Sequence, residues 1–298
     1  MKILAIGLGK MGAPMARHLA AAGFDVLGVE PGAERRAALT DIGFPIVASL
    51  DEVDGADRIV VSSLPDDGAL GRVADQLGAR PQVGTTWIDT STVSLDASRH
   101  AAAMCAARAL PYLRAPISGN APMAERAVLT VLVSGDRATH DRCLPLFACW
   151  GPKCIYLGDD EQARVAKLVV NLMVAGTSGM LAEALTLGQR GGIAWDDLWG
   201  VLEGSAVASP ILLAKAPALR ARDYAPTFTV AQMCKDLGLI RAVAEQLGVA
   251  VPIAAVVDEA MHDADRAGDS DRDYAVIIRQ AERRAGTPID STPTLEHS

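Results

Sequence analysis

The fold is decided by residues 1–31, which read MKILAIGLGKMGAPMARHLAAAGFDVLGVEP. A short apolar run is followed by Gly7, Gly9 and Gly12 in the spacing G-x-G-x-x-G. An amphipathic, alanine-rich stretch, Pro14–Ala22, comes next, and then a second apolar run. Strand, glycine turn, helix and second strand therefore arrive in the order of a βαβ unit that binds a dinucleotide.

Each glycine of the turn has a physical role in such a unit. Gly7 permits the tight turn, Gly9 lets the backbone approach a pyrophosphate, and Gly12 allows the helix to pack closely on the strand. The start of the helix offers free N–H groups and the positive end of a dipole to the phosphates. The residues expected to bind the cofactor here are Gly7, Leu8, Gly9, Lys10, Met11 and Gly12.

The second strand ends at Glu30, twenty-one residues after Gly9. A carboxylate at this point accepts hydrogen bonds from the adenosine ribose and repels a 2′-phosphate, which favours NAD over NADP. Arg35 and Arg36 follow closely and offer the alternative, a pair of cations for a phosphate.

The first half of the chain alternates apolar strands with amphipathic helices, which is typical of a parallel sheet wrapped by helices. Strand patterns end near Ala163, and the remainder of the chain has helical patterns. The sequence thus predicts an α/β Rossmann-type N-terminal domain and an all-α C-terminal domain, joined by a long helix. The boundaries are residues 1–162 for dinucleotide binding, 163–286 for substrate binding and oligomerisation, and 287–298 for a disordered tail.

Predicted strands lie at Ile3–Ile6, Val26–Val29, Ile59–Ser62, Trp87–Asp89, Leu110–Ala115 and Leu129–Val133. Beyond Pro14–Ala22, predicted helices lie at Ser94–Ala107, Ala163–Arg190, Trp195–Glu203, Pro210–Ala221, Val230–Leu247, Ile253–Ala267 and Tyr274–Arg284.

Composition narrows the possible partners. The formal net charge is −8 and the pI about 5.2, without a basic stripe, so nucleic acid and anionic membranes are not expected partners. The five cysteines have no CxxC spacing and indicate reduced thiols in a cytoplasmic protein, with no metal site. The most apolar stretch, Leu168–Leu187, is interrupted by polar residues and is expected to be a buried helix instead of a membrane span.

Lys167 and Asn171 lie four residues apart on a predicted helix, so both project from one face. A lysine among apolar neighbours is costly to bury unless it has partners or a function. Partial desolvation lowers the pKa of such a lysine and makes proton exchange near neutral pH feasible. The alternative is a lysine whose stem covers apolar surface while its ammonium group reaches water.

At this point the residues resemble a known family. The run GLGKMGAPMARHLAAAG is similar to the opening pattern of the β-hydroxyacid dehydrogenases, which include 3-hydroxyisobutyrate dehydrogenase, tartronate semialdehyde reductase and, more distantly, 6-phosphogluconate dehydrogenase. Further blocks occur in the family's order: SSLPDD at 62–67, DTSTVS at 89–94, APISGN at 115–120, GDDEQARVAKLVVN at 158–171 and CKDLGLIRAVAEQLGVAVP at 234–252.

This resemblance implies an NAD(P)-dependent oxidoreductase that transfers hydride between a small hydroxy acid and nicotinamide, with Lys167 as general acid and base and Asn171 holding the substrate. It also implies homodimers or homotetramers. Leu64 and Pro65 look like an apolar wall beside the dinucleotide, and Thr92 is the better candidate of the hydroxyls at 91 and 92. The remaining expected substrate residues are Ser118, Gly119, Asn120 and Lys235. Lys235 is also expected near the nicotinamide, although a simple ion pair between the domains would fit it too.

Two residues depart from the family pattern in the substrate loop. Asn120 stands where the family has the second glycine of S-G-G, and Arg114 stands where it has an acidic residue. Both leave the particular hydroxy acid open, and Asn120 offers an extra hydrogen bond. Two other functions stay open: an imine or other C=X reductase, which usually carries Asp or Tyr in place of Lys167, and a non-catalytic dinucleotide-binding scaffold.

Overall fold

The computed structural model describes residues 1–53, 58–80 and 85–286. Contacts divide the chain into two compact units, Met1–Lys167 and the part from Leu168 onward. The division falls inside the long helix α7, Gln162–Arg190, instead of at its first residue. The tail from Thr287, expected to be disordered, lies outside the described residues.

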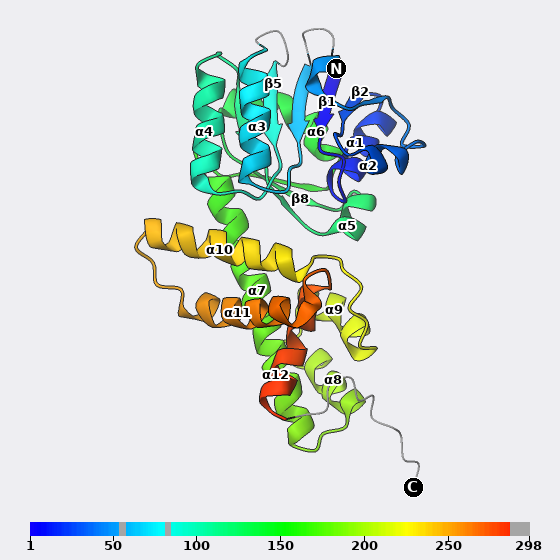
Figure 1. Cartoon of the computed structure of the whole chain (residues 1–298), viewed down its shortest axis with the longest axis vertical. Helices are drawn as coiled ribbons and strands as arrows, with labels where there is room; N and C mark the ends of the chain where they lie inside the picture. Colours follow the sequence, from blue (N-terminus) through cyan, green and yellow to red (C-terminus); the bar gives the residue numbers. More distant parts are fainter. Residues whose placement is uncertain (54–57, 81–84, 287–298) are drawn as a thin grey trace. The chain divides into compact units, whose positions relative to one another are not determined.

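A six-stranded sheet forms the centre of the first unit (Figure 1). Its order is β3-β2-β1-β4-β5-β6, the order of dinucleotide-binding folds, and every pairing is parallel. The predicted parallel sheet is thus confirmed with two differences: a short strand, β3, is added, and the predicted strand Leu129–Val133 does not belong to this sheet. The strands are β1 Lys2–Ile6, β2 Asp25–Val29, β3 Ile46–Val47, β4 Arg58–Ser62, β5 Thr86–Asp89 and β6 Tyr112–Arg114.

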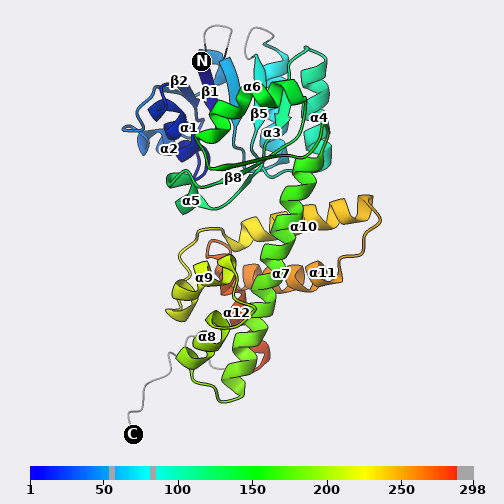
Figure 2. The same cartoon turned by 180° about the vertical axis from the view of Figure 1, so that it is seen from behind.

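Alternate residues along these strands feed two separate cores, because successive side chains of a strand point to opposite faces. Ile3 and Ala5 join one core with α1, whereas Leu4 and Ile6 join the other with α3. Helices α3 and α4 cover the face seen in Figure 1, and α6 lies on the face seen in Figure 2. The helices of this unit are α1 Gly12–Ala21, α2 Ala33–Ala37, η1 Leu50–Glu52, α3 Asp67–Gly78, α4 Leu95–Ala106, α5 Ala121–Glu125 and α6 Arg137–Ala148.

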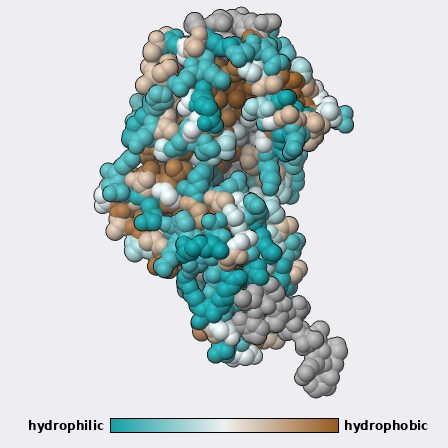
Figure 3. Space-filling view, viewed as in Figure 1, coloured by the Kyte–Doolittle hydropathy of each residue, from teal (hydrophilic) through white to brown (hydrophobic). Residues whose placement is uncertain are grey.

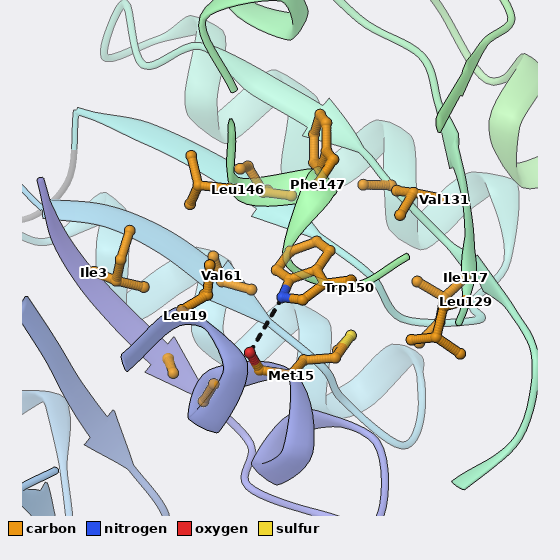
Figure 4. Close-up of a cluster of buried hydrophobic side chains, with 14 of the residues drawn as sticks. Ile3, Met15, Leu19, Val61, Ile117, Leu129, Val131, Leu146, Phe147 and Trp150 are labelled. Atoms are coloured by element: carbon orange, nitrogen blue, oxygen red, sulfur yellow. Dashed lines mark hydrogen bonds between the residues drawn. The ribbon is translucent and has the colours of Figure 1, made fainter. Parts of the chain in front are cut away.

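A second, three-stranded sheet was not anticipated from the sequence, although its central strand falls within the predicted strand Leu129–Val133. It consists of β7 Ile117–Ser118, β8 Thr130–Val133 and β9 Lys153–Tyr156, with β7 antiparallel and β9 parallel to β8. Its inner residues share a core with α1 and α6. Trp150 is fully buried there, and its Nε1 donates a hydrogen bond to the carbonyl oxygen of Met15 at 3.2 Å (Figure 4).

The second unit is helical throughout its described part, with a single isolated bridge between Thr229 and Asp273. The all-α prediction is therefore confirmed. One expected helix is too long at its end: α11 stops at Ala264, and a π turn comes next in which Gly268 has a φ of 87°. The elements are α8 Trp195–Glu203, α9 Pro210–Arg220, α10 Val230–Gln246, α11 Pro252–Ala264, η2 Asp265–Asp269, η3 Tyr274–Ile277 and α12 Ile278–Arg284.

Helix α7 is less buried than expected. Within the described part of the chain it is the one helix long and apolar enough to cross a membrane by length and composition, and 33% of its most apolar window is buried. Met173, Met180 and Leu187 are 65%, 61% and 75% exposed and recur every seven residues, so they lie in one stripe along the helix. The expectation of a buried helix is wrong for that stripe.

Candidate active site

The glycine turn has the geometry that a dinucleotide needs. Gly7 has a φ of 84°, in the left-handed region that favours glycine. A Cβ on Gly12 would overlap the carbonyl oxygen of Gly7, so the helix starts directly against the turn. No described heavy atom lies within 4 Å of a Cβ placed on Gly9, apart from its chain neighbours. Open space beside bare backbone at Gly9 fits an approaching pyrophosphate.

The loop after β4 lies against this turn. β1 and β4 are adjacent parallel strands, so their carboxyl ends share one edge of the sheet. The N–H of Ser63 donates to the carbonyl oxygen of Ile6 at 2.9 Å, and a Cβ on Gly7 would overlap the carbonyl oxygen of Ser63. Strand order reverses between β1 and β4, which is where ligands bind in open α/β sheets. Leu64 is half-buried and Pro65 is exposed at this edge.

Glu30 sits at the end of β2 and bonds to the glycine turn. Its Oε2 accepts from the N–H of Leu8 at 3.0 Å and its Oε1 accepts from the N–H of Gly32 at 3.0 Å. Arg35 Nε donates to the carbonyl oxygen of Leu8 at 2.9 Å. Arg36 Nη1 donates to the carbonyl oxygens of Glu30 and Pro31. Both arginines thus bond to backbone around the carboxylate.

The hydroxyl of Ser91, just after β5, is bonded inside the protein. Ser91 is buried, and its Oγ donates to Asp89 Oδ1 at 2.6 Å and accepts from the N–H of Leu64 at 2.9 Å. Thr92 is half-buried. The following helix, α4, is capped by Ser94, whose side chain accepts from the N–H of Ala97.

A buried arginine that sequence reasoning missed stands beside these loops. Arg164, in the first turn of α7, is 1% exposed, and its Nη2 donates to Asp89 Oδ2 at 2.5 Å. Burial lowers the pKa of Arg164, but Tyr112 and Asp89 raise it, and the net shift is upward. Burial also raises the pKa of Tyr112, so its hydroxyl stays neutral and can accept from the guanidinium. The available signal was a single charged residue ending an apolar strand, Asp89.

The loop Ser118–Asn120 is shaped by its own side chains. Gly119 has a φ of 144°, and the Oδ1 of Asn120 accepts from the N–H of Met123 at 3.1 Å, which caps α5. The departure from a second glycine therefore has a structural use, and one oxygen of Asn120 is already bonded. Ser118 is half-buried and Gly119 is exposed. Nearby, Ala127 has a φ of 52°, in the left-handed region that favours glycine.

The other departure, Arg114, points to an internal partner. Its Nε and Nη2 donate to Glu161 Oε1 at 2.8 and 2.6 Å, and both side chains are buried. Its guanidinium carbon also lies 5.2 Å from the centre of the Tyr112 ring. Arg114 therefore joins β6 to the residue just before α7, and the doubt it raised about the substrate has no support in its contacts.

Lys167 lies in the second turn of α7 and is half-buried. Asn171, one turn further, is 7% exposed, and its Nδ2 donates to Asp236 Oδ2 at 2.5 Å. The ammonium of Lys235 lies 3.2 Å from the other oxygen of Asp236. This ion pair joins neighbours on α10, whereas the alternative expected for Lys235 was a pair between domains, so that alternative stays untested.

A parallel sheet in this strand order, with a glycine turn at the switch point, defines a dinucleotide-binding fold. Comparison with known families agrees. Residues 2–158 match the NAD binding domain of 6-phosphogluconate dehydrogenase, and residues 162–281 match the NAD-binding domain of NADP-dependent 3-hydroxyisobutyrate dehydrogenase. The chain belongs to the β-hydroxyacid dehydrogenase family, within the 6-phosphogluconate dehydrogenase superfamily, and is an NAD(P)-dependent oxidoreductase of that type.

Similar proteins come from plants and bacteria. Glyoxylate/succinic semialdehyde reductase 1 of Arabidopsis thaliana is 28% identical over 93% of this chain and 97% of its own. An NAD-dependent L-serine dehydrogenase of Pseudomonas aeruginosa is 30% identical over 93% of this chain and 96% of its own. A solved structure of Mycobacterium tuberculosis 3-hydroxyisobutyrate dehydrogenase with L-serine has a TM-score of 0.85 at 27% identity, covering 94% of this chain and 98% of that one.

Proposed function

We propose that this protein interconverts a small carboxylate-bearing hydroxy acid and its aldehyde or keto form, with Lys167 as the general acid and base. The observation that carries the proposal is the place of Lys167, in the second turn of α7 and in the same compact unit as the glycine turn. The position matches the catalytic lysine of the family. A non-catalytic scaffold has no need of a half-buried lysine there.

The residues around Lys167 and the loop at Ser118 have separate tasks in this reaction. When bound, the nicotinamide accepts or supplies a hydride. Lys167 takes the hydroxyl proton in oxidation and returns it to the carbonyl oxygen in reduction. Ser118 and the N–H groups of its loop offer donors to a carboxylate. Asp236 bonds the amide nitrogen of Asn171, which leaves the amide oxygen as an acceptor for a substrate hydroxyl.

The glycine turn, Leu64 and Pro65 after β4, and Thr92 after β5 are proposed to hold the dinucleotide. Lys10 is exposed at the turn and offers a cation to the phosphates. Lys235, on α10, is proposed to bind the substrate or the nicotinamide end of the cofactor. In support, Lys235 and Asn171 both bond to the same carboxylate, Asp236.

A substrate panel tests the reaction class. Purified protein is mixed with NAD or NADP and L-serine or 3-hydroxyisobutyrate, and with NADH or NADPH and glyoxylate, succinic semialdehyde or a cyclic imine, and nicotinamide absorbance is followed. We expect turnover of at least one carboxylate-bearing compound and none of the imine. Turnover of the imine alone would favour the imine reductase alternative, and failure to bind either dinucleotide would contradict the cofactor site.

The cofactor is proposed to be NAD in preference to NADP. Glu30 is anchored through both oxygens beside the turn, so its negative charge is held where a 2′-phosphate would arrive. We expect the Kd of NADPH to exceed that of NADH at least about tenfold, or ~1.4 kcal/mol. Glu30→Gln should narrow this ratio, and Arg35→Ala should leave it unchanged. A preference for NADPH that Arg35→Ala or Arg36→Ala abolishes would show that the arginines bind the phosphate.

The exposed stripe of α7 is proposed as a contact with a second copy of the chain, giving a homodimer or homotetramer. Exposed Ile253 and Val256 on α11 add apolar surface, and apolar side chains gather around the connection between α10 and α11 in Figure 3. Light scattering should give a multiple of the 31.1 kDa chain mass, and Met173→Glu with Met180→Glu should reduce it to one chain. A monomeric wild type would contradict this.

The protein is further proposed to be cytoplasmic. Its five cysteines are free thiols, which supports a reducing compartment.

A further inference from the structure

The guanidinium of Arg164 is bonded on all sides although it is almost completely buried. Besides Asp89, it donates from Nη1 to the carbonyl oxygen of Ser91 at 2.6 Å, from Nη2 to the hydroxyl of Tyr112 at 3.0 Å, and from Nε to the hydroxyl of Ser98 at 3.2 Å. These partners come from β5, the loop after it, β6 and α4. One side chain of α7 therefore contacts four separate segments of the first unit.

The carboxylate of Asp89, which pairs with Arg164, also bonds to the end of β4 and to the loop after β5, the two segments proposed to hold the dinucleotide. Asp89 Oδ1 accepts from the hydroxyls of Ser62, at the end of β4, and Ser91, after β5, at 2.5 and 2.6 Å. Ser91 in turn holds the N–H of Leu64. The loop after β4, the loop after β5 and the start of α7 thus share one continuous hydrogen-bonded network.

The spacing along α7 links this network to Lys167. Residues three apart on a helix are related by about 4.5 Å of rise and about 60° of rotation, so they lie on neighbouring positions of one face. Because both residues lie on one continuous helix, we expect a displacement of its first turn at Arg164 to move Lys167 as well. A buried ion pair is often no more stabilising than well-packed apolar side chains. A gain in stability is therefore a weak explanation for the buried charges of Arg164 and Asp89.

We propose that Arg164 is a positioning residue for the reaction: it holds the first turn of α7 against the loops after β4 and β5, and so sets where Lys167 stands relative to a substrate on the nicotinamide. This inference rests on the proposed role of Lys167. Arg164 touches neither substrate nor cofactor in this scheme. It acts through the helix that carries Lys167 and through Asp89.

A matched control is available at the same helix. Glu161, just before α7, is buried and paired with Arg114, and this pair is separate from the hydrogen bonds that join Arg164 to Asp89 and Ser91. Glu161→Gln therefore breaks a buried ion pair at the start of α7 and removes a charge that acts on Arg164 through space, but it leaves the hydrogen bonds of Arg164 and Asp89 in place. It reports how activity responds to the loss of a buried ion pair at this helix when those hydrogen bonds are kept.

The experiment compares Arg164→Gln, Arg164→Lys and Glu161→Gln in the full-length protein, by kcat per folded protein, Kd of the dinucleotide and Tm. Misplacing a catalytic group by about 1 Å costs about a hundredfold. We expect the kcat of Arg164→Gln to fall about a hundredfold, while its dinucleotide Kd changes less than about threefold. Arg164→Lys should recover part of the lost kcat. Glu161→Gln should keep kcat within about threefold of the wild type. Equal losses of kcat in Arg164→Gln and Glu161→Gln would overturn the proposal.

Two further variants keep the test decisive. If Arg164→Gln does not fold, Tyr112→Phe removes one hydrogen bond to the guanidinium, and kcat should fall about threefold to tenfold. In a Lys167→Met background, Arg164→Lys should cause no further loss, because residues that act as a unit are not additive. An unchanged kcat in Tyr112→Phe and an additive loss in the double variant each contradict the positioning role. Full activity of Lys167→Met alone contradicts the proposed function instead.

Discussion

Replacing Lys167 with methionine is expected to lower kcat/KM by about 10²- to 10⁴-fold, the range that general acid–base catalysis contributes. Methionine keeps the length and apolar stem of the side chain but cannot exchange a proton. The loss should appear in kcat, since the lysine is proposed to act on the hydroxyl proton as the hydride moves. Steady-state kinetics with the substrate found in the panel measures it.

The control for this variant is Lys153→Met, which removes an exposed lysine from β9 in the same unit and should leave kcat/KM unchanged. The dinucleotide Kd of Lys167→Met should stay close to that of the wild type, because the glycine turn is not altered. Turnover at the wild-type rate would show that another group exchanges the proton.

Two alanine substitutions in the glycine turn are expected to separate folding from cofactor binding. Gly12→Ala places a Cβ on the carbonyl oxygen of Gly7, so backbone must shift. We expect the free energy of unfolding to fall by about 1–3 kcal/mol, typical of overpacking, and dinucleotide binding to weaken as well. Chemical denaturation of the cofactor-free protein measures the first effect.

Gly9→Ala is the matched variant, because the added Cβ enters open space. The free energy of unfolding should change by no more than about 0.5 kcal/mol, as for ordinary surface substitutions. The Kd of the dinucleotide should nevertheless rise about tenfold or more, since the methyl group stands where the pyrophosphate approaches. Unchanged dinucleotide affinity in Gly9→Ala would show that the phosphates do not pass this residue.

Local sequence patterns predicted most strands of the first sheet and nearly all helices of the second unit. The predicted strand Ile59–Ser62 differs from β4 by one residue, and Trp195–Glu203 is identical to α8. Such segments carry their own signal, a continuous apolar run or a helical period. The small sheet was missed because β7 has two residues and β9 lies half-exposed, so neither shows a clear alternation.

The buried charges could not be predicted from the sequence. Arg164 comes shortly after Glu161 and Gln162 at the start of a helix, where charged side chains are ordinarily solvated. Its burial depends on Asp89 and Tyr112, which are 75 and 52 residues away along the chain. Arg114 is similarly paired with Glu161, 47 residues away along the chain, so the sequence alone gives no sign that its side chain points inward. Pairings of this kind are decided by tertiary contacts, whereas Glu30 was recognisable because its spacing from the turn is local.

The cap that Asn120 forms on α5 has a consequence for how the substrate loop meets a ligand. A flexible loop must give up backbone conformations when a ligand binds, and this entropy opposes association. A hydrogen bond from Met123 to Asn120 already restricts the chain just after Ser118 and Gly119. The loop is therefore partly preorganised before a substrate acid binds. Binding then has a smaller entropic penalty, but the loop adapts less readily to ligands of different shape.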